Sequence, residues 1–369
     1  MGPTKAIIRH QNLLHNLQLI QTAVAPAKVM GVVKADAYGH GSVEIAKTLI
    51  ANGVDYLGVA FFEEGIELRK AGIDVPILVF GAHLPEFFPQ FLDYDLDITL
   101  TDAAQLEPLR ALCKQRKKRA RVQIKVDTGM GRVGFFADKD FELIRRIVDE
   151  PAWLTVGIYS HLSSADEEDS TYTLGQIQRF TAFKERLQKV AACKPFFHLA
   201  NSAAIMRYPQ AYFDYVRPGV MLYGNPPGPD FKLTWDLREV MEFKSRITLI
   251  KKLPPRHPVS YNRRYHTPQA THIGIVPAGY ADGYNRRFTN TGQVLIRGRR
   301  YPVVGTVCMD QFMVDLGAQT DVQTGDEVIL FGKQGNEHIS IVEISRKLET
   351  IPYEVTCWVS RRVPRIHER

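Results

Sequence analysis

The first 230 residues of the chain alternate short apolar runs with segments of helical spacing. Eight runs are rich in β-forming residues, and they occupy 28–33, 55–60, 76–80, 96–100, 121–126, 154–160, 196–200 and 213–218. The clearest helical segment is Tyr172–Cys193, where apolar side chains recur at steps of three and four. Apolar strands that alternate with helices are typical of a parallel sheet covered by helices. Eight such units favour an α/β fold of the (β/α)8 TIM-like barrel type, with an open doubly wound sheet as the alternative.

The sequence changes in character after Gly224, where NPPGPD at 225–230 resembles a linker. Beyond it, short β-rich runs separated by Gly, Asn and Pro occupy 247–253, 271–280, 292–298, 301–309, 312–316, 326–332 and 353–360. These runs predict a separate, mostly antiparallel β domain, and the spacing within 339–351 predicts one short helix in it. We therefore expect a barrel domain over 8–232 and a β domain over 233–369, with residues 1–7 as a candidate for pairing with the second.

Composition narrows the class of protein. Hydrophobic residues make up 45% and charged residues 24%, which excludes a disordered chain and a fibrous repeat. No apolar run of about 18 residues is present, and the N-terminus lacks the pattern of a secretory signal, so we expect no membrane partner. The four cysteines lie far apart, which predicts no metal cluster and suits a reducing, cytoplasmic location. The net charge of +7 is concentrated in 233–369 and is too dilute to indicate a nucleic-acid partner.

The polar residues of the first domain gather just after the apolar runs. In a barrel, side chains at the C-terminal ends of the strands meet on one rim. The rim residues so predicted are Lys34, Tyr38, Lys125, Arg132, His161, His198, Asn201, Ser202, Arg217, Gly219, Val220 and Tyr223. The ends of the second, third and fourth runs carry little polar chemistry. Cations, histidines and hydroxyls on one rim indicate a site for a phosphorylated, anionic cofactor.

Lys34 is the most informative of these residues because it directly follows a buried apolar run. One interpretation is a strand-end lysine that reaches solvent. The other is a Schiff-base lysine, whose amine becomes nucleophilic when its pKa is lowered. Repulsion by Arg132 and Arg217 would lower that pKa.

Seven segments together resemble the alanine racemase family, in the family's order and over nearly the whole chain. They are VVKADAYGHG, KVDTGMGRVG, HLANSAA, RPGVMLYG, VSYNRRY, VGTVCMDQFMVDL and YEVTCWVSRRVPR. The resemblance implies a barrel that binds pyridoxal 5′-phosphate (PLP), a C-terminal β domain and a homodimer with shared active sites. It also implies interconversion of L-alanine and D-alanine by two-base proton transfer through a PLP external aldimine, which supplies D-alanine for peptidoglycan.

The resemblance assigns roles to residues of the barrel. Lys34 is the implied PLP lysine and one of the two bases. Arg217 faces the pyridine nitrogen, and Arg132 contacts the cofactor's phenolic oxygen and the substrate carboxylate. The other implied cofactor-binding residues are Tyr38, His161, Asn201, Ser202, Gly219, Val220 and Tyr353. Lys125 matches a lysine that the family often carries as a carbamate.

The β domain supplies two further residues by the same resemblance. Tyr261 matches the second base, which racemisation requires because one lysine cannot easily serve both faces of the substrate carbon. Met309 offers its backbone N–H to the substrate carboxylate. Asn262 and Arg264 depart from the Gly and Thr of many family members, and the N-terminus lacks the family's usual Trp.

Plainer interpretations stay open for single residues. Lys125 could be an ordinary strand-end lysine, Arg217 a member of a rim ion pair, Tyr261 a packing residue and Ser202 a helix N-cap. For the whole chain, the alternatives are a related barrel decarboxylase, a racemase of serine or of several small amino acids, and a non-catalytic PLP-binding protein.

Overall fold

The eight apolar runs form a closed parallel barrel in the computed structural model, which describes residues 2–369. The barrel strands are β2 (Lys28–Val32), β3 (Tyr56–Val59), β4 (Ile77–Val79), β5 (Asp97–Leu100), β6 (Ala120–Asp127), β8 (Trp153–Tyr159), β9 (Phe196–His198) and β10 (Tyr215–Val216). Their order around the ring is β5-β4-β3-β2-β10-β9-β8-β6, and the pairing of β5 with β6 closes it. The barrel prediction is confirmed, and the doubly wound alternative is wrong because an open sheet would lack that last pairing.

Alternate residues of each barrel strand face opposite sides of the sheet. On β6, Val122 and Ile124 belong to the large apolar core that the surrounding helices share. Gln123, between them, pairs across the sheet with Thr99 of β5 and is fully buried. A second, separate apolar cluster is built around Tyr56 and Tyr159. The barrel interior is therefore a mixture of apolar and polar side chains.

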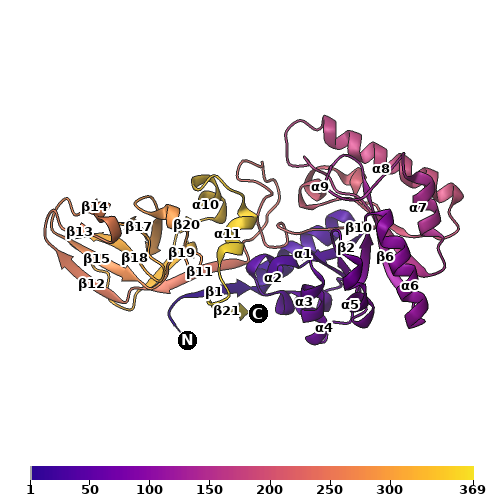
Figure 1. The fold of residues 1–369 in the computed structure, drawn as a ribbon. Helices are drawn as coiled ribbons and strands as arrows, with labels where there is room; N and C mark the ends of the chain where they lie inside the picture. The colour runs from indigo at the N-terminus through magenta and orange to yellow at the C-terminus, as the bar shows by residue number, and fades with distance from the viewer. Residues whose placement is uncertain (1) are drawn as a thin grey trace.

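Helices cover the outside of the barrel (Figure 1). They are α1 (His10–Val24), α3 (Ser42–Ala51), α4 (Phe62–Lys70), α5 (Phe88–Asp93), α6 (Leu106–Arg116), α7 (Phe141–Val148), α8 (Thr171–Val190) and α9 (Ser202–Arg207). The short segment α2 (Lys34–Gly39) has left-handed backbone angles and lies at the C-terminal end of β2. Short 3-10 turns η1 (Pro85–Phe87), η2 (Ala103–Gln105) and η3 (Pro209–Ala211) lie between the helices, and β7 (Phe135–Phe136) pairs with β6. Helix α8 confirms the helix predicted over 172–193. None of the helices within residues 2–369 combines the length and apolarity that crossing a bilayer demands.

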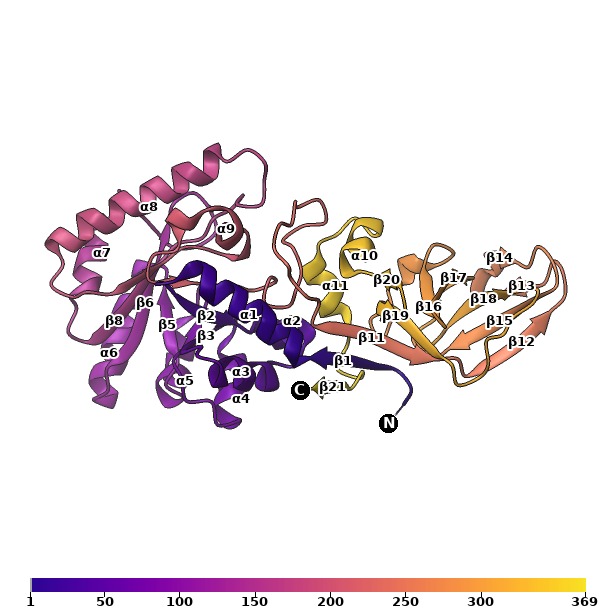
Figure 2. The ribbon, with the colours of Figure 1, turned by 180° about the vertical axis from the view of Figure 1, so that it is seen from behind.

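The C-terminal part of the chain forms a mostly antiparallel sheet beside the barrel (Figures 1 and 2). Its larger strands are β11 (Met241–Arg246), β12 (Leu249–Leu253), β15 (Thr271–Val276), β16 (Gln293–Ile296), β17 (Arg299–Val304), β18 (Phe312–Gly317) and β19 (Glu327–Gln334). The smaller pieces are β13 (Pro258–Val259), η4 (Tyr261–Arg263), β14 (Tyr265–His266), η5 (Arg286–Phe288) and β20 (Glu337–Ile339). The N-terminal strand β1 (Lys5–Arg9) enters this sheet between β11 and β21 (Arg365–Glu368). The two ends of the chain are thus tied to the same sheet.

Two helices stand in the C-terminal part, one predicted and one not. Helix α10 (Ile341–Lys347) confirms the helix expected within 339–351. The run 353–360, predicted to be β-rich, is instead helix α11 (Pro352–Trp358). Pro352 begins this helix, where the missing N–H costs nothing, and the buried Val355 and Thr356 face the protein. Contacts with α10 and α2 outweigh the local β preference of its residues.

Candidate active site

A cavity of about 480 Å³ opens at the C-terminal ends of the barrel strands. Four cationic side chains line it, from Lys34, Lys125, Arg132 and Arg217. Within the described part of the chain, no carboxylate belongs to this lining. The cavity is therefore electrostatically suited to an anionic ligand.

A second cavity, of about 680 Å³, has a different character. It lies by the linker region, and its lining mixes the cations of Arg9 and Lys333 with the carboxylates of Glu239 and Glu242. Charges of both signs pair with one another there, as Arg9 and Glu242 do at 3.3 Å. The barrel-end cavity, with cations alone, is the stronger candidate for a functional site.

Lys34 begins a turn of unusual backbone conformation. The four residues from Ala35 to Tyr38 all have φ between 52° and 55°, in the left-handed region that costs energy for L-residues. The Glu64 carboxylate accepts a hydrogen bond from the Ala35 N–H at 2.6 Å, and Asp36 accepts one from the Ser42 N–H at 2.8 Å. Strained backbone that is held by such contacts is found at functional sites.

The C-terminal helix α11 braces the far end of this turn. Gly39 has a φ of 85°, and a Cβ at this position would overlap the carbonyl oxygen of Thr356. The Arg365 Nε donates a hydrogen bond to the Gly39 carbonyl at 3.0 Å. This packing brings the Tyr353 ring to within 6.0 Å of the Tyr38 ring. The turn after β2 and the C-terminal helix together form one wall of the cavity.

Both lysines of the cavity have a lowered pKa. Burial is the larger cause for Lys34, and the nearby Arg132 adds to it. Lys125 is only 2% exposed, and burial together with the charges of Arg217 and Arg132 lowers its pKa to about 7. A neutral amine is a nucleophile, so a lowered pKa favours the reactive form of both side chains.

Arg217 is buried at the floor of the cavity. Its guanidinium donates to the carbonyls of Ser160 at 2.7 Å and Leu199 at 3.0 Å, and it contacts His198 Nδ1 at 2.8 Å. A weaker contact joins it to His161 Nδ1 at 3.3 Å. Burial lowers the pKa of Arg217 to about 10, so the group stays cationic at neutral pH. A rim ion pair is excluded, because the partners of this arginine are carbonyls and imidazoles.

The end of the cavity opposite Arg217 is formed by side-chain hydroxyls and by backbone N–H groups. The Ser202 Oγ accepts hydrogen bonds from the N–H groups of Gly219 at 2.9 Å and Met221 at 3.4 Å. Among residues 2–369, no group accepts a hydrogen bond from the N–H of Val220. The helix N-cap is Asn201, whose Oδ1 accepts from the Ala204 N–H at 3.0 Å. The N-cap interpretation of Ser202 is therefore wrong, and its hydroxyl instead orders the loop that follows β10.

Arg132 lies on a loop that Asp127 shapes at the end of β6. The Asp127 carboxylate accepts hydrogen bonds from three successive N–H groups, those of Gly129, Met130 and Gly131, at 2.8–2.9 Å. Arg132 itself is exposed at the cavity mouth, and no residue from 2 to 369 forms an ion pair with it. Its guanidinium is thus available to a ligand.

Comparison with known proteins identifies the family. Residues 8–227 match the model of the alanine racemase N-terminal domain, and residues 240–367 match that of the C-terminal domain. The chain belongs to the alanine racemase family. Alanine racemase 2 of Caldanaerobacter subterraneus is 42% identical, over 99% of this chain and 95% of that protein. The structure of alanine racemase from Clostridium difficile 630 has a TM-score of 0.94 at 38% identity, covering 100% of this chain and 96% of that one. The Bartonella henselae enzyme, solved with covalently bound pyridoxal phosphate, has a TM-score of 0.88 at 27% identity and full coverage of both chains.

The structure brings most of the predicted site residues of this family member together. Those that line the barrel-end cavity are Lys34, Tyr38, Lys125, Arg132, His161, Asn201, Ser202, Arg217, Gly219, Val220 and Tyr353. Tyr261 and Met309 are not among them. They are 69% and 52% exposed on the β domain. The strands that flank Tyr261, β13 and β14, lie at the end of the molecule furthest from the barrel (Figure 1).

Tyr261 is nevertheless held in a defined conformation. It opens the 3-10 turn η4, where Ser260 and Asn262 have φ values of 65° and 61°. Thr306 steadies this turn, since its carbonyl accepts from the Ser260 hydroxyl at 2.6 Å and its own hydroxyl donates to the Tyr261 carbonyl at 2.9 Å. The segment from Thr306 leads directly to Met309, so one edge of the β domain carries both residues.

Among the cavity residues that the sequence did not predict, three have aromatic rings that bear on the site, namely Tyr159, Phe61 and His83. Tyr159 lies with its ring 5.6 Å from the Lys125 amine and 5.3 Å from the Arg217 guanidinium. It lies two positions before the predicted rim residue His161, at the end of the same apolar run, which was the available signal. Phe61 and His83 follow the second and third barrel strands and also line the cavity. The expectation that these strand ends carry little polar chemistry is wrong for His83.

Proposed function

We propose that the chain interconverts L-alanine and D-alanine with pyridoxal 5′-phosphate held in the barrel-end cavity. The observation that carries this proposal is Lys34, an amine of lowered pKa in a cavity lined by cations. A PLP molecule has a phosphate and a phenolic oxygen, and alanine brings a carboxylate. Cations without carboxylates fit these three acceptors. The relative from Bartonella henselae, with its covalent pyridoxal phosphate, supports the choice of cofactor.

The residues at the two ends of the cavity fit the two ends of the cofactor. Tyr38, Ser202, Gly219, Val220 and Tyr353, with Asn201 beside them, would hold the phosphate through hydroxyls and backbone N–H groups. At the other end Arg217 would donate to the ring nitrogen. Because an arginine gives up no proton at neutral pH, the ring nitrogen would stay unprotonated. When bound, the cofactor supplies an aldehyde for amines and withdraws electrons from the substrate α-carbon.

Around the phenolic side of the cofactor, Arg132 and His161 would bind the cofactor oxygen, and Arg132 would also bind the substrate carboxylate. Lys125, with its pKa near 7, would react with carbon dioxide to form a carbamate. The resulting anion would lie near Arg132 and Arg217 and offset their mutual repulsion.

Lys34 would remove or return the α-proton on one face of the substrate, and Tyr261 would do so on the other. Tyr261 is exposed at the end of the β domain and does not line the cavity of its own chain. A homodimer resolves this separation, with the β domain of one protomer covering the barrel of its partner. Phe61, at the cavity and 65% exposed, and Tyr280, 43% exposed beside Met309, provide apolar surface for such an interface.

In this proposal the barrel domain over 8–232 binds the cofactor, and the β domain over 233–369 completes the partner's site. The enzyme would work in the cytoplasm and supply D-alanine for peptidoglycan. The alternative within the same fold is a racemase of serine or of several small amino acids.

Two measurements test the proposed function. Purified protein is incubated with PLP, and we expect a visible absorption band that borohydride abolishes, with the reduced cofactor mapped to Lys34 by peptide mass spectrometry. A label on Lys125, or no band, would contradict the assignment of Lys34. The protein is then assayed for racemisation of L-alanine, L-serine and other small amino acids. We expect the highest kcat/KM for alanine, and a higher value for serine would favour the alternative.

A further inference from the structure

A continuous line of hydrogen bonds runs through the barrel interior, starting at Arg217. The Arg217 guanidinium contacts His198 Nδ1 at 2.8 Å. On the other side of the same ring, His198 Nε2 lies 2.7 Å from Gln123 Oε1. His198 and Gln123 are both completely buried, and the Tyr159 ring stacks on the imidazole at 4.8 Å.

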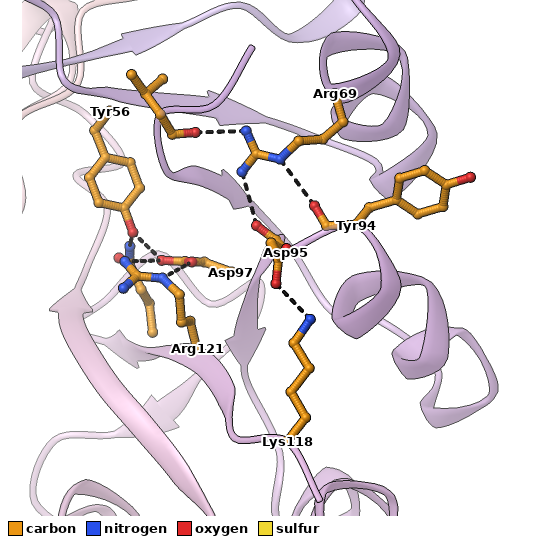
Figure 3. A network of polar contacts seen from close by, with 9 residues as sticks. Tyr56, Arg69, Tyr94, Asp95, Asp97, Lys118 and Arg121 are labelled. Atoms are coloured by element: carbon orange, nitrogen blue, oxygen red, sulfur yellow. Dashed lines mark hydrogen bonds and ion pairs between the residues drawn. The ribbon is translucent and has the colours of Figure 1, made fainter. Parts of the chain in front are cut away.

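The line continues toward the opposite end of the barrel, which Figure 3 shows from close by. Gln123 Nε2 donates to Tyr56 Oη at 2.8 Å, and the Tyr56 hydroxyl donates to Asp97 Oδ2. Arg121 Nε donates to Asp97 Oδ1 at 2.8 Å and closes the line at the surface. The five links join β10, β9, β6, β3 and β5, so they cross the whole barrel.

The residues at the two ends of this line, Asp97 and Arg217, determine which atoms donate and which accept in the hydrogen bonds between them. A carboxylate can only accept, so the Tyr56 hydrogen must point to Asp97 and its oxygen must accept from the Gln123 amide nitrogen. The Gln123 oxygen then faces His198 and requires a hydrogen on Nε2. That leaves Nδ1 without a hydrogen, as the donor-only Arg217 demands. Each group has one consistent orientation.

Burial keeps the middle members in the protonation states that this order needs. It lowers the pKa of His198 well below its usual value, with a further contribution from the Arg217 charge, so the ring is neutral. Burial, followed by the Asp97 charge, raises the pKa of Tyr56 well above its usual value, so the phenol keeps its hydrogen. Polar groups in a barrel interior are costly unless each is paired, and here each link is paired.

We infer that Gln123, Tyr56 and Asp97 are positioning residues that act through His198 on the guanidinium of Arg217. They select the tautomer of His198 that can accept from Arg217, and so hold this arginine with its free N–H groups toward the cavity. The consequence for catalysis rests on the proposed function, in which Arg217 faces the ring nitrogen of the cofactor. The tautomer of His198 does not rest on it.

The test uses the full-length protein as purified, labelled with ¹⁵N-histidine. His198 is assigned by its absence in His198→Asn. In the wild type we expect one tautomer, with hydrogen on Nε2 and none on Nδ1. In Tyr56→Phe the Gln123 amide can reverse, and we expect the Nε2–H signal to move upfield or a second tautomer to appear. Gln123→Met, which removes the acceptor itself, is expected to have the larger effect.

A matched control is available in the same part of the barrel. The Tyr215 ring lies 5.7 Å from the Tyr56 ring, but its hydroxyl contacts Asp55 at 3.2 Å, outside the line. Tyr215→Phe therefore removes a phenol oxygen from the same region and is expected to leave the His198 signals unchanged.

Kinetics of the PLP-loaded enzyme give the second readout. Gln123→Met removes the buried hydrogen bond between Gln123 and His198, the residue that contacts the charged Arg217. We expect this loss to lower kcat about tenfold. The KM for alanine is expected to stay within about twofold, because the substrate carboxylate would bind Arg132 rather than Arg217. If Gln123 had only a structural role, Gln123→Met would lower the stability of the protein but would not lower kcat while leaving KM nearly unchanged.

Identical His198 signals in Tyr56→Phe and wild type would overturn the inference, whatever the activity. If Gln123→Met does not fold, Tyr56→Phe decides, since it removes only one oxygen atom. A wild-type protein with the expected His198 tautomer and no racemase activity would refute the proposed function and leave the positioning role intact.

Discussion

The hydroxyl of Tyr38 occupies the space that a Cβ of residue 219 would fill. Gly219 is thus a glycine because Tyr38, itself buried, lies against its backbone. The same glycine donates its N–H to Ser202. This end of the cavity, where we propose that the cofactor phosphate binds, therefore depends on the close fit between the Tyr38 phenol and the Gly219 backbone.

Gly219→Ala tests this fit. The added methyl group must displace the Tyr38 hydroxyl, and overpacking of this kind costs about 1–3 kcal/mol. We expect the dissociation constant for PLP, measured by fluorescence titration, to rise about tenfold or more. Gly228→Ala is the control, because a Cβ there meets nothing within 4 Å. Equal PLP affinity of Gly219→Ala and wild type would contradict the role of Tyr38 and Gly219 in holding the phosphate.

The pKa of Lys125, lowered to about 7, predicts how carbamate formation depends on pH. Only the neutral amine attacks carbon dioxide, and it loses a proton in doing so. At a fixed concentration of dissolved carbon dioxide, the carbamate is expected to increase as the pH rises through about 7. The signal is followed by ¹³C NMR with labelled bicarbonate, and it is expected to disappear in Lys125→Met but not in Lys70→Met, which alters an exposed lysine. A pH profile that begins to rise only above pH 9 would show that Lys125 behaves as an ordinary lysine.

The barrel could be predicted from the sequence because its signals are local. Each strand is a short apolar run, and each helix such as α8 repeats at steps of three and four. Helix α11 escaped prediction because its β-branched residues favour a strand locally, whereas its packing on Gly39 is a contact between residues more than 300 positions apart. Pairings of this kind, including the entry of β1 beside β21, leave no local pattern.

The part of the site that lies at the ends of the barrel strands could be predicted from the sequence, because these ends meet on one rim. Lys34 and Arg217 lie within two residues of the ends of β2 and β10, so the barrel geometry brings them together. Along β6 the polar residues Arg121, Gln123 and Lys125 alternate with apolar ones, which is a signal for an interior polar line. Its partners Tyr56 and Asp97 are single residues in other runs, and only the closed ring shows that they meet.

The buried imidazole of His40 leads us to predict that the protein loses stability in acid. It is fully buried, stacks on Tyr223 at 4.5 Å, and donates from Nδ1 to the carbonyls of Ala37 and Tyr38. Burial lowers its pKa from 6.5 to about 3. The unfolded chain therefore takes up a proton near pH 6.5 while the folded chain does not, so the stabilisation is complete above pH 6.5 and is lost as the pH falls toward 3.

This dependence is measured by urea unfolding at several pH values. His40 alone contributes a slope of up to about 1.4 kcal/mol per pH unit between the two pKa values. His40→Asn keeps a donor at this position without the titration and is expected to flatten the curve. The exposed His257→Asn serves as control. A pH dependence that His40→Asn leaves unchanged would assign the acid sensitivity to other groups.

The separation of Lys34 from Tyr261 leads to a prediction about mixed dimers. Lys34 lines the barrel-end cavity, whereas Tyr261 lies exposed on the β domain. Homodimers of Lys34→Ala and of Tyr261→Phe are each expected to be nearly inactive as racemases. If one site uses Lys34 of one protomer and Tyr261 of the other, a hybrid dimer contains one site with both native residues and one with neither.

Equal amounts of the two variants are unfolded, mixed and refolded with PLP. Random pairing makes about half of the dimers hybrid, and half of their sites are intact, so the activity is expected to approach about a quarter of the wild-type value. Native mass spectrometry verifies that hybrids form, and each variant refolded alone provides the baseline. Hybrids that stay as inactive as their parents would mean that each site takes both bases from a single chain, which would require Tyr261 to move from the exposed position that it has in this structure.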